Sequence, residues 1–228
     1  MVKLDGATLY GFGDSLVRGH ELDYGMLDDL AARHGMRYVK YAQNGATVVP
    51  TRPSDHTWPS DNDVPDVARQ LRDADPAAPD LIVFDGLTND GASYVPALRA
   101  LGTLTAGYDA AAFDPNTYLG AFECVLATLR AKYPLTPAFF VAPHHMPLIA
   151  PALQDQLHAA ARAACAKWAI PVVDVYREGQ INTCLPEMAR RFSYNSGKVP
   201  HDGDGTHLNQ AGYQRFYTPL LDWKLAQA

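Results

Sequence analysis

Short apolar segments alternate with stretches of helical periodicity along this 228-residue chain, and no other feature constrains its fold as much. The apolar segments are residues 7–12, 36–41, 81–84, 137–142 and 171–175. Apolar residues recur at three- and four-residue spacing over residues 22–30, 118–129, 153–168 and 209–221. Such alternation predicts βαβ units. We therefore expect an α/β chain, in which a five-stranded parallel sheet is covered by helices on both faces.

Individual residues indicate where some of these elements lie and end. Leu81–Phe84 is apolar throughout, as is typical of a strand that is buried on both faces. Gly35 follows the first helical stretch and predicts its C-cap. Pro219 predicts that the last helix ends or kinks there. No linker interrupts the pattern, so we expect one domain over residues 1–228.

Composition and charge exclude several classes of protein. With 47% hydrophobic and 19% charged residues, the chain can build a core, which excludes an intrinsically disordered protein. No apolar run reaches the roughly 18 residues of a membrane-spanning helix, so we expect no membrane partner. The net charge is −6 and the basic residues are scattered. Since binding to phosphates needs a basic surface, we expect no nucleic acid partner either.

The cysteines and the start of the sequence bear on the cellular compartment. Cys124, Cys165 and Cys184 form no CxxC pair, and three thiols cannot all be bridged to one another. This usage is typical of a reducing compartment. Residues 1–5 lack the apolar stretch of a secretory signal, so we expect a cytoplasmic protein.

Two predicted connections, residues 48–65 and 90–116, are longer than ordinary loops. Loops beyond about 12–15 residues in a compact domain are usually functional. We expect both to line a substrate site, with Trp58 and Tyr94 as candidate substrate contacts. His144, which follows the fourth predicted strand, is a further candidate. The alternative is that the two loops only decorate the surface.

A candidate nucleophile and a candidate base lie near opposite ends of the chain. Ser15 follows the first predicted strand, where a parallel sheet places its ligand sites. A serine hydroxyl becomes nucleophilic when a neighbouring base accepts its proton. His207 is the strongest candidate for that base, and Asp204, three residues earlier, can orient its imidazole. Each feature alone has an ordinary alternative, a helix cap for the serine and a chance DxxH for the pair.

Together, four ordered blocks resemble the GDSL group of the SGNH hydrolase superfamily. Gly13–Leu16 is the complete GDSL motif, and Gly45 follows the second predicted strand. Asn89 follows the third, and Asp204–His207 matches the final DxxH block. The resemblance covers nearly the whole chain. In one departure, Leu87 stands where the family has a glycine two residues before the asparagine.

The resemblance implies the SGNH hydrolase fold, a three-layer α/β/α sandwich with a flavodoxin-like five-stranded parallel sheet. It also implies a serine hydrolase in which Ser15 attacks an acyl carbonyl. His207 would accept the serine proton and Asp204 would orient His207. The backbone N–H groups of Ser15 and Gly45 and the side-chain amide of Asn89 would form the oxyanion hole. This scheme needs no metal and no cofactor.

Several other polar residues have structural explanations. We expect Asp14 to tie its turn through backbone N–H groups and Asp90 to hold the loop of Asn89. His201 and Asp202 precede Asp204, but the spacing of this cluster matches no zinc site. The remaining histidines are expected on the surface or on a helix face: His20, His34 and His158.

The expected partner is a small-molecule ester. The two long loops are rich in aromatic and polar residues and contain no long apolar stretch, which favours a short acyl group on a small or carbohydrate alcohol. The alternative is a non-catalytic carbohydrate- or ligand-binding module that retains the fold, since fold alone does not imply activity. A metal-dependent phosphoesterase is a third hypothesis. The sequence does not indicate the oligomeric state.

Overall fold

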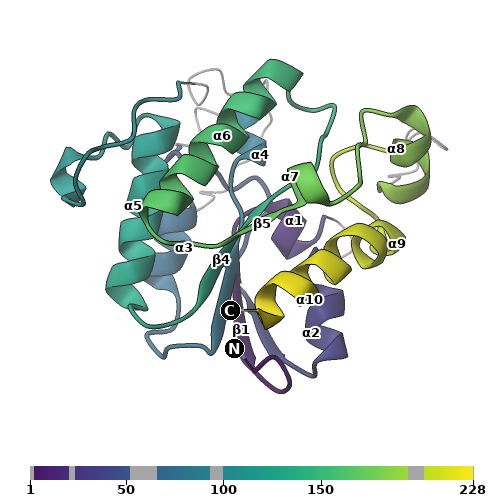
Figure 1. Cartoon of the computed structure of the whole chain (residues 1–228), viewed down its shortest axis with the longest axis horizontal. Helices are drawn as coiled ribbons and strands as arrows, with labels where there is room; N and C mark the ends of the chain where they lie inside the picture. Colours follow the sequence, from purple (N-terminus) through teal and green to yellow (C-terminus); the bar gives the residue numbers. More distant parts are fainter. Residues whose placement is uncertain (1–2, 21–23, 52–65, 93–99, 195–202, 228) are drawn as a thin grey trace.

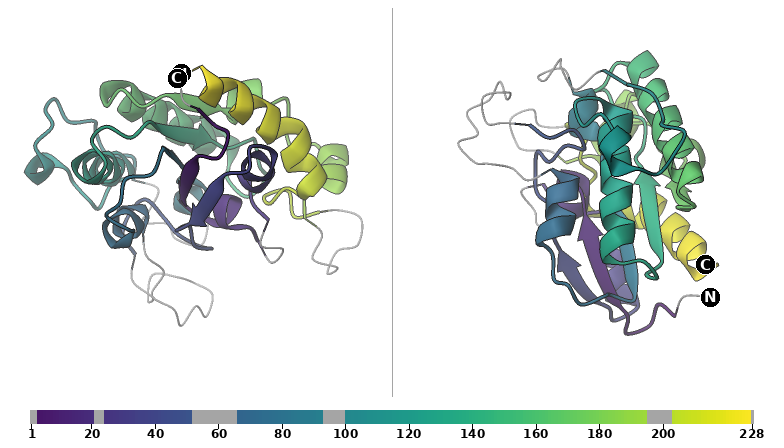
Figure 2. Two further views of the ribbon diagram at one scale, coloured as in Figure 1. Left: turned by 90° about the horizontal axis from the view of Figure 1, so that it is seen from below. Right: turned by 90° about the vertical axis from the view of Figure 1, so that its left-hand side faces the viewer.

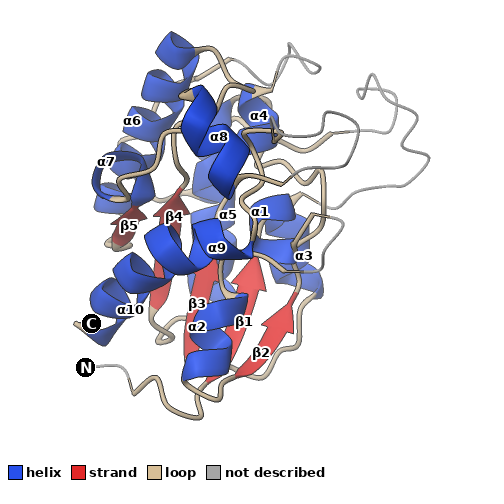
Figure 3. Ribbon diagram, turned by 90° about the vertical axis from the view of Figure 1, so that its right-hand side faces the viewer, coloured by secondary structure: helices blue, strands red, loops and turns tan. Residues whose placement is uncertain are grey.

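The chain folds around one parallel sheet. The computed structural model describes residues 3–20, 24–51, 66–92, 100–194 and 203–227. Its strands are β1 Thr8–Phe12, β2 Arg37–Lys40, β3 Leu81–Phe84, β4 Ala138–Ala142 and β5 Val172–Asp174. All neighbours pair in parallel, in the order β2-β1-β3-β4-β5; Figure 1 shows the whole chain, and Figure 3 labels the five strands. This is the flavodoxin-like order, so the predicted fold class is confirmed.

Helices cover both faces of the sheet. The longer ones are α2 Asp28–Arg33, α3 Val67–Asp73, α5 Tyr118–Lys132, α6 Pro151–Lys167, α8 Pro186–Phe192 and α10 Thr218–Ala226. The short ones are α1 Ser15–Arg18, α4 Thr88–Gly91, α7 Val175–Glu178 and α9 Gln210–Gly212, with a 3₁₀ turn η3 at Ala110–Ala112 and a π-helical turn η4 at Tyr213–Tyr217. Figure 3 shows α2 and α10 in front of the strands and α3 and α5 behind them. The result is three layers.

The carboxyl ends of the strands point to one edge of the sheet. Figure 3 shows α1, α4, α8 and α9 above the arrowheads at this edge. β1 pairs with β2 on one side and with β3 on the other, so the chain changes direction across the sheet at β1. Ligand sites of open α/β sheets lie beside such a point. The segments that follow β1, β2 and β3 are therefore well placed to form one site.

The first helix ends as predicted but begins later. Met26 and Leu27 are buried in a turn before α2, and the helix itself starts at Asp28. At its end, Gly35 has φ +57° and the Met36 N–H donates to the Ala31 carbonyl at 2.9 Å. This is a Schellman motif, in which glycine relieves the positive φ.

Pro219 does not end the last helical stretch, contrary to one of its two predicted effects. The stretch passes through the π-helical turn η4, and Pro219 then lies in the first turn of α10, which continues to Ala226. A proline fits the first turn of an α-helix because its missing N–H is not needed there. The short helices α3 and α8 were not predicted from the sequence, since about two turns are too few for a clear periodicity.

The core lies between the sheet and its two helical layers. Leu81–Phe84 is fully buried, as its apolar sequence predicts. The Phe84 ring packs against Phe122 of α5 and Phe140 of β4, with centroids 6.3 and 5.5 Å away. Among the described helices, none combines the length and the apolarity needed to cross a bilayer.

Part of the second long connection packs against the helical layer. Tyr108 and Phe113 pack edge-on against Trp168, just beyond the end of α6. Figure 2 shows this teal segment on the far side of the molecule from α10. Other described residues of the connection lie closer to the carboxyl edge, since Asp90 belongs to α4 and the Ala100 carbonyl accepts from the Tyr118 N–H at the start of α5. That residues 90–116 line a substrate site stays a prediction.

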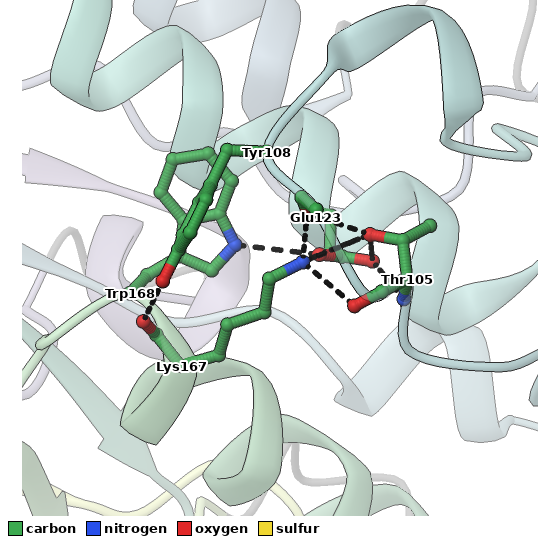
Figure 4. A network of polar contacts seen from close by, with 6 residues as sticks. Thr105, Tyr108, Glu123, Lys167 and Trp168 are labelled. Atoms are coloured by element: carbon green, nitrogen blue, oxygen red, sulfur yellow. Dashed lines mark hydrogen bonds and ion pairs between the residues drawn. The ribbon is translucent and has the colours of Figure 1, made fainter.

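A buried ion pair anchors this segment (Figure 4). Glu123 of α5 is fully buried and forms an ion pair with Lys167 of α6. The Lys167 ammonium also donates to the Thr105 carbonyl at 2.9 Å, and Thr105 N–H donates to Glu123 at 2.9 Å. Burial raises the pKa of Glu123, but hydrogen bonds from Lys167 and Thr105 outweigh it and lower the pKa overall. The carboxylate is therefore charged, and its charge is compensated.

Candidate active site

A tight turn after β1 carries the candidate nucleophile. Gly13 has φ +130°, and a Cβ on it would lie 1.7 Å from Asp85 Oδ1, so no other residue fits. Gln70 of α3 is buried and accepts from the Gly13 N–H at 2.9 Å. The Gln70 amide donates back to the Gly13 carbonyl, also at 2.9 Å. The turn thus delivers Ser15 to the start of α1 on a firmly held backbone.

Two buried carboxyl groups lie beneath this turn. Asp14 caps α1 by accepting from the Leu16 N–H at 2.8 Å, which confirms its predicted role in the turn. The Asp14 N–H donates to Asp85 Oδ1 at 2.9 Å. Burial raises the pKa of both groups, and the charge of Asp14 raises that of Asp85 further. The charge of either group therefore disfavours ionisation of the other.

The structure brings the two ends of the chain into contact at Ser15. Its Oγ lies 2.8 Å from His207 Nε2, although the two residues are 192 positions apart. His207 Nδ1 lies 2.6 Å from Asp204 Oδ2. A carboxylate at Nδ1 favours the tautomer that carries its proton there, which leaves Nε2 free to accept from a hydroxyl. The three side chains therefore form a continuous chain of hydrogen bonds.

The Asp204 turn is built to keep its carboxylate charged. The backbone N–H groups of Thr206 and His207 both donate to Asp204 Oδ1 at 2.9 Å. Burial raises the pKa of Asp204, but hydrogen bonds and the charge of His207 outweigh it and lower the pKa overall. Gly203 and Gly205 flank the residue at φ +67° and +70°, where other side chains are strained.

Tyr194, just after α8, clamps this turn through its backbone. Its N–H donates to the His207 carbonyl at 2.6 Å, and its carbonyl accepts from the Asp204 N–H at 2.8 Å. Ser193 and Leu208 extend the pairing as an antiparallel bridge. Contacts of this kind use only the backbone, so the sequence carried no signal for them.

Gly45 lies in a turn between residues 43 and 46, after β2. Its φ is +83°, and the Ala46 N–H closes the turn on the Gln43 carbonyl at 3.1 Å. Gln43 N–H in turn donates to the Gly13 carbonyl at 3.1 Å, which links this turn to that of the nucleophile. In the described part of the chain, the Gly45 N–H donates to no other residue.

The buried side chain of Asp90 holds the loop segment that follows Gly45. Its carboxylate accepts from the N–H groups of Val48 and Val49, both at 2.9 Å. Burial raises the pKa of Asp90 to about 7, although these two N–H groups act to lower it. The sequence predicted that Asp90 holds the loop of Asn89, whereas its carboxylate accepts hydrogen bonds from the loop that follows Gly45.

Asn89 lies in α4, beside the same turn. Its amide nitrogen donates to the Ala46 carbonyl at 2.8 Å and makes a longer contact of 3.4 Å with Asp14. Leu87 is compatible with this placement because Gly86 supplies the unusual backbone, at φ +151°, one residue earlier. A Cβ on Gly86 would lie 2.6 Å from Val48. Position 86 therefore requires a glycine in this chain.

Of the three candidate substrate contacts, the structure describes only His144. Trp58 and Tyr94 lie outside the described residues, as do His201 and Asp202. His144 is fully buried, and its Nδ1 lies 2.7 Å from the hydroxyl of Tyr217. Burial lowers its pKa to about 3. The predicted substrate-contact role of His144 was therefore wrong, because its side chain belongs to the core between β4 and η4.

His20 lies in the site, although the sequence indicated a surface residue. Its ring stacks on the His207 ring, with centroids 3.9 Å apart and planes at 11°. His20, Asp204 and His207 each offer one donor atom within 4.8 Å of the others, as a metal site would. A metal ion must lie near the plane of each imidazole that binds it. Two stacked, nearly parallel rings cannot share an ion without turning, so this arrangement does not fit a metal.

Comparison with known proteins decides the family. The family model for GDSL-like lipases and acylhydrolases matches residues 11–215. The chain belongs to this family. The match spans the GDSL motif and the DxxH block whose side chains meet here, and it supports hydrolase activity at the level of the family. No curated protein matches this GDSL-family chain.

Solved structures share the fold of this GDSL-family protein at low sequence identity. A protein from Lactobacillus plantarum aligns with a TM-score of 0.76 and 19% identity over 98% of both chains. One from Chitinophaga pinensis, described as a possible lipase, has a TM-score of 0.68 and 16% identity over 97% of this chain and 98% of its own. The lipase/acylhydrolase from Enterococcus faecalis aligns with a TM-score of 0.56 and 16% identity over 96% of this chain and 95% of its own.

Proposed function

We propose that this protein is a serine esterase that hydrolyses short-chain acyl esters. The observation that carries the proposal is the hydrogen-bonded chain from Ser15 Oγ through His207 to Asp204, with distances of 2.8 and 2.6 Å. In the first step, Ser15 attacks the ester carbonyl while Nε2 of His207 takes the serine proton. Protonated His207 then gives that proton to the leaving alcohol. A water molecule then attacks the acyl-enzyme in the same way, with His207 as base, and the acid is released from Ser15.

The oxyanion of each tetrahedral intermediate needs hydrogen-bond donors. The proposed donors are the backbone N–H groups of Ser15 and Gly45 and the side-chain amide of Asn89. Asn89 already binds the Ala46 carbonyl through one amide hydrogen. Its amide also makes a 3.4 Å contact with Asp14, which is long for a hydrogen bond and would be exchanged for the oxyanion. Loss of one such donor typically lowers turnover by roughly 10²–10³.

The proposed substrate is a short acyl group, such as acetyl, on a small or carbohydrate alcohol. The support comes from the composition of residues 48–65, which include aromatic and polar residues and no long apolar stretch. A long acyl chain would need a continuous apolar groove.

The test compares Ser15→Ala with the wild-type protein on p-nitrophenyl acetate. We expect turnover to fall by about 10³-fold or more, since the variant has no nucleophile and keeps only the residual acceleration from the oxyanion donors and substrate binding. Thr128→Ala, which removes a hydroxyl from α5 away from the site, should keep full activity. Equal turnover of Ser15→Ala and wild type would refute the proposal. Binding of an acetylated sugar without acid release would favour a binding module instead.

A second series defines the acyl group. Wild-type protein is assayed on p-nitrophenyl esters from acetate to dodecanoate and on acetylated sugars. We expect kcat/KM to be highest for the shortest acyl chains and to fall as the chain grows. A maximum at decanoate or dodecanoate would contradict the short-chain assignment while leaving the serine mechanism intact.

A further inference from the structure

Ser15 and His20 flank the short helix α1: Ser15 is its first residue, and His20 follows its C-cap residue, Gly19. The Gly19 N–H donates to the Ser15 carbonyl at 2.9 Å. Gly19 has φ +96°, a conformation that other residues rarely adopt, and it directs the chain away from the helix axis. The next residue, His20, stacks on His207. One turn of helix thus presents both the nucleophile and a flat ring to the same imidazole.

The same ring also contacts the clamp of the Asp204 turn. The Tyr194 ring meets His20 edge-on, with centroids 5.5 Å apart and planes at 79°. Tyr194 holds both ends of the Asp204–His207 turn through its backbone. His20 therefore packs between the base and the residue that fixes the backbone of the base.

We propose that His20 is a positioning residue, which holds the plane of the His207 imidazole by stacking and stabilises the imidazolium formed during acyl transfer. This inference rests on the proposed function, because it assigns His207 the role of base. Hydrogen bonds to Ser15 and Asp204 hold the two ring nitrogens of His207, but they oppose tilting of the ring only weakly. A parallel ring at 3.9 Å opposes that tilt directly.

The second effect is electrostatic. The π face of a neutral ring attracts a cation, and such contacts are worth about 0.5–2 kcal/mol. The His207 side chain is only 16% exposed, so the contact is poorly screened by water. Because the attraction exists only when His207 carries the proton, it acts on the transition state and the intermediates, and not on substrate binding.

The test uses two substitutions at one position. His20→Ala removes the ring, and His20→Phe keeps a flat π face without ring nitrogens. On p-nitrophenyl acetate we expect His20→Ala to lower kcat roughly 3- to 30-fold with little change in KM, which corresponds to the cation–π range. His20→Phe should restore most of the lost kcat. His34→Ala, which removes a histidine paired with Asp5 and Asp222, should match wild type.

Two results would overturn the inference. Unchanged kcat in His20→Ala would show that the stack has no effect on the reaction. Equal loss in His20→Phe and His20→Ala would show that a ring nitrogen matters and the stack does not. If Ser15→Ala is inactive while either result is obtained, the serine mechanism stands and only the role of His20 fails.

A measurement without substrate separates positioning from loss of folding. The proton between His207 Nδ1 and Asp204 gives a far-downfield NMR signal, whose exchange rate depends on how well the ring is held. We expect faster exchange in His20→Ala and a rate near wild type in His20→Phe. Urea denaturation of both variants checks that the fold is kept. Equal exchange rates in wild type and His20→Ala would contradict the positioning role.

Discussion

At the scale of single residues, the candidate site depends on glycines at positions where a Cβ would collide with a neighbouring residue. Gly13 leaves room for the carboxyl group of Asp85, which in turn accepts from the Asp14 N–H next to the nucleophile. Gly86 leaves room for Val48 beside the loop of Gly45. In both places a backbone turn and a neighbouring side chain occupy the volume of an absent Cβ. The turn that carries Ser15 therefore tolerates no larger residue at position 13.

Gly13→Ala tests this packing. The new methyl group would lie 1.7 Å from Asp85 Oδ1, and the backbone at φ +130° disfavours alanine. We expect a loss of several kcal/mol in the free energy of unfolding, about 3 or more, since overpacking and backbone strain add. Urea denaturation measures the loss. Gly6→Ala is the matched control, because its φ is also positive but nothing lies within 4 Å of a Cβ. Similar losses in both variants would contradict the steric argument.

The contact of Ser15 with His207 could be predicted because each residue lies in a short motif next to a predicted strand end or helix start. Gln70, Asp85 and Tyr194 could not be predicted in the same way. Gln70 acts across 57 positions through a side-chain clamp, and Tyr194 acts through its backbone. Neither has a local pattern that differs from an ordinary helix or loop residue. His20 was missed because stacking depends on the turn at Gly19, which only the folded backbone shows.

At the scale of elements, part of the second long connection is anchored on the helical layer. The sequence predicted that residues 90–116 line the substrate site, since long loops are often functional, and this stays a prediction. Residues 105–113 pack on α5 and α6, where Glu123 and Lys167 hold them (Figure 4). A loop of this length carries no local signal for which helix it will cover, because the partners are distant in sequence.

Lys167→Met tests how much this ion pair contributes to the free energy of unfolding. Removal of the ammonium leaves the Glu123 carboxylate buried without its cation, which typically destabilises a protein by about 3–5 kcal/mol. Ester hydrolysis at a temperature well below unfolding should be nearly unchanged, since Lys167 lies at the end of α6 and holds residues around Thr105. Urea denaturation measures the loss of stability, and hydrolysis of p-nitrophenyl acetate measures the activity. Lys224→Met is the control, because its pair with Glu178 is surface-exposed and should contribute about 0–1 kcal/mol. A large drop in turnover would show that the segment reaches the site after all.

At the scale of the whole molecule, buried carboxyl groups couple stability to pH. Asp14, Asp85 and Asp90 are all buried near the carboxyl edge of the sheet, beside β1 and β3. Burial raises the pKa of each of them. A carboxyl group whose pKa is raised on folding binds its proton more tightly in the folded state. Stability must therefore fall as the pH rises between the unfolded and the folded pKa.

Asp90→Asn tests this coupling. The pKa of Asp90 is about 7 in the folded protein, against about 3.9 in an unfolded chain. We expect the free energy of unfolding of the wild type to decrease from pH 5 to pH 7, and the slope to be smaller in the variant. Asparagine keeps an oxygen that can accept from Val48 and Val49 and does not titrate. Urea midpoints over this range measure both slopes, and exposed Asp109→Asn should match wild type. Identical slopes in Asp90→Asn and wild type would show that Asp90 does not control this dependence.

The 192-residue separation of Ser15 and His207 has a consequence for synthesis of the protein. The ribosome adds His207 192 residues after Ser15, and the sheet can begin to assemble while translation continues between them. Under the proposed mechanism, a nascent chain is inert toward esters until residues 204–207 have left the exit tunnel. Hydrolytic activity would then report when these two parts of the chain have met.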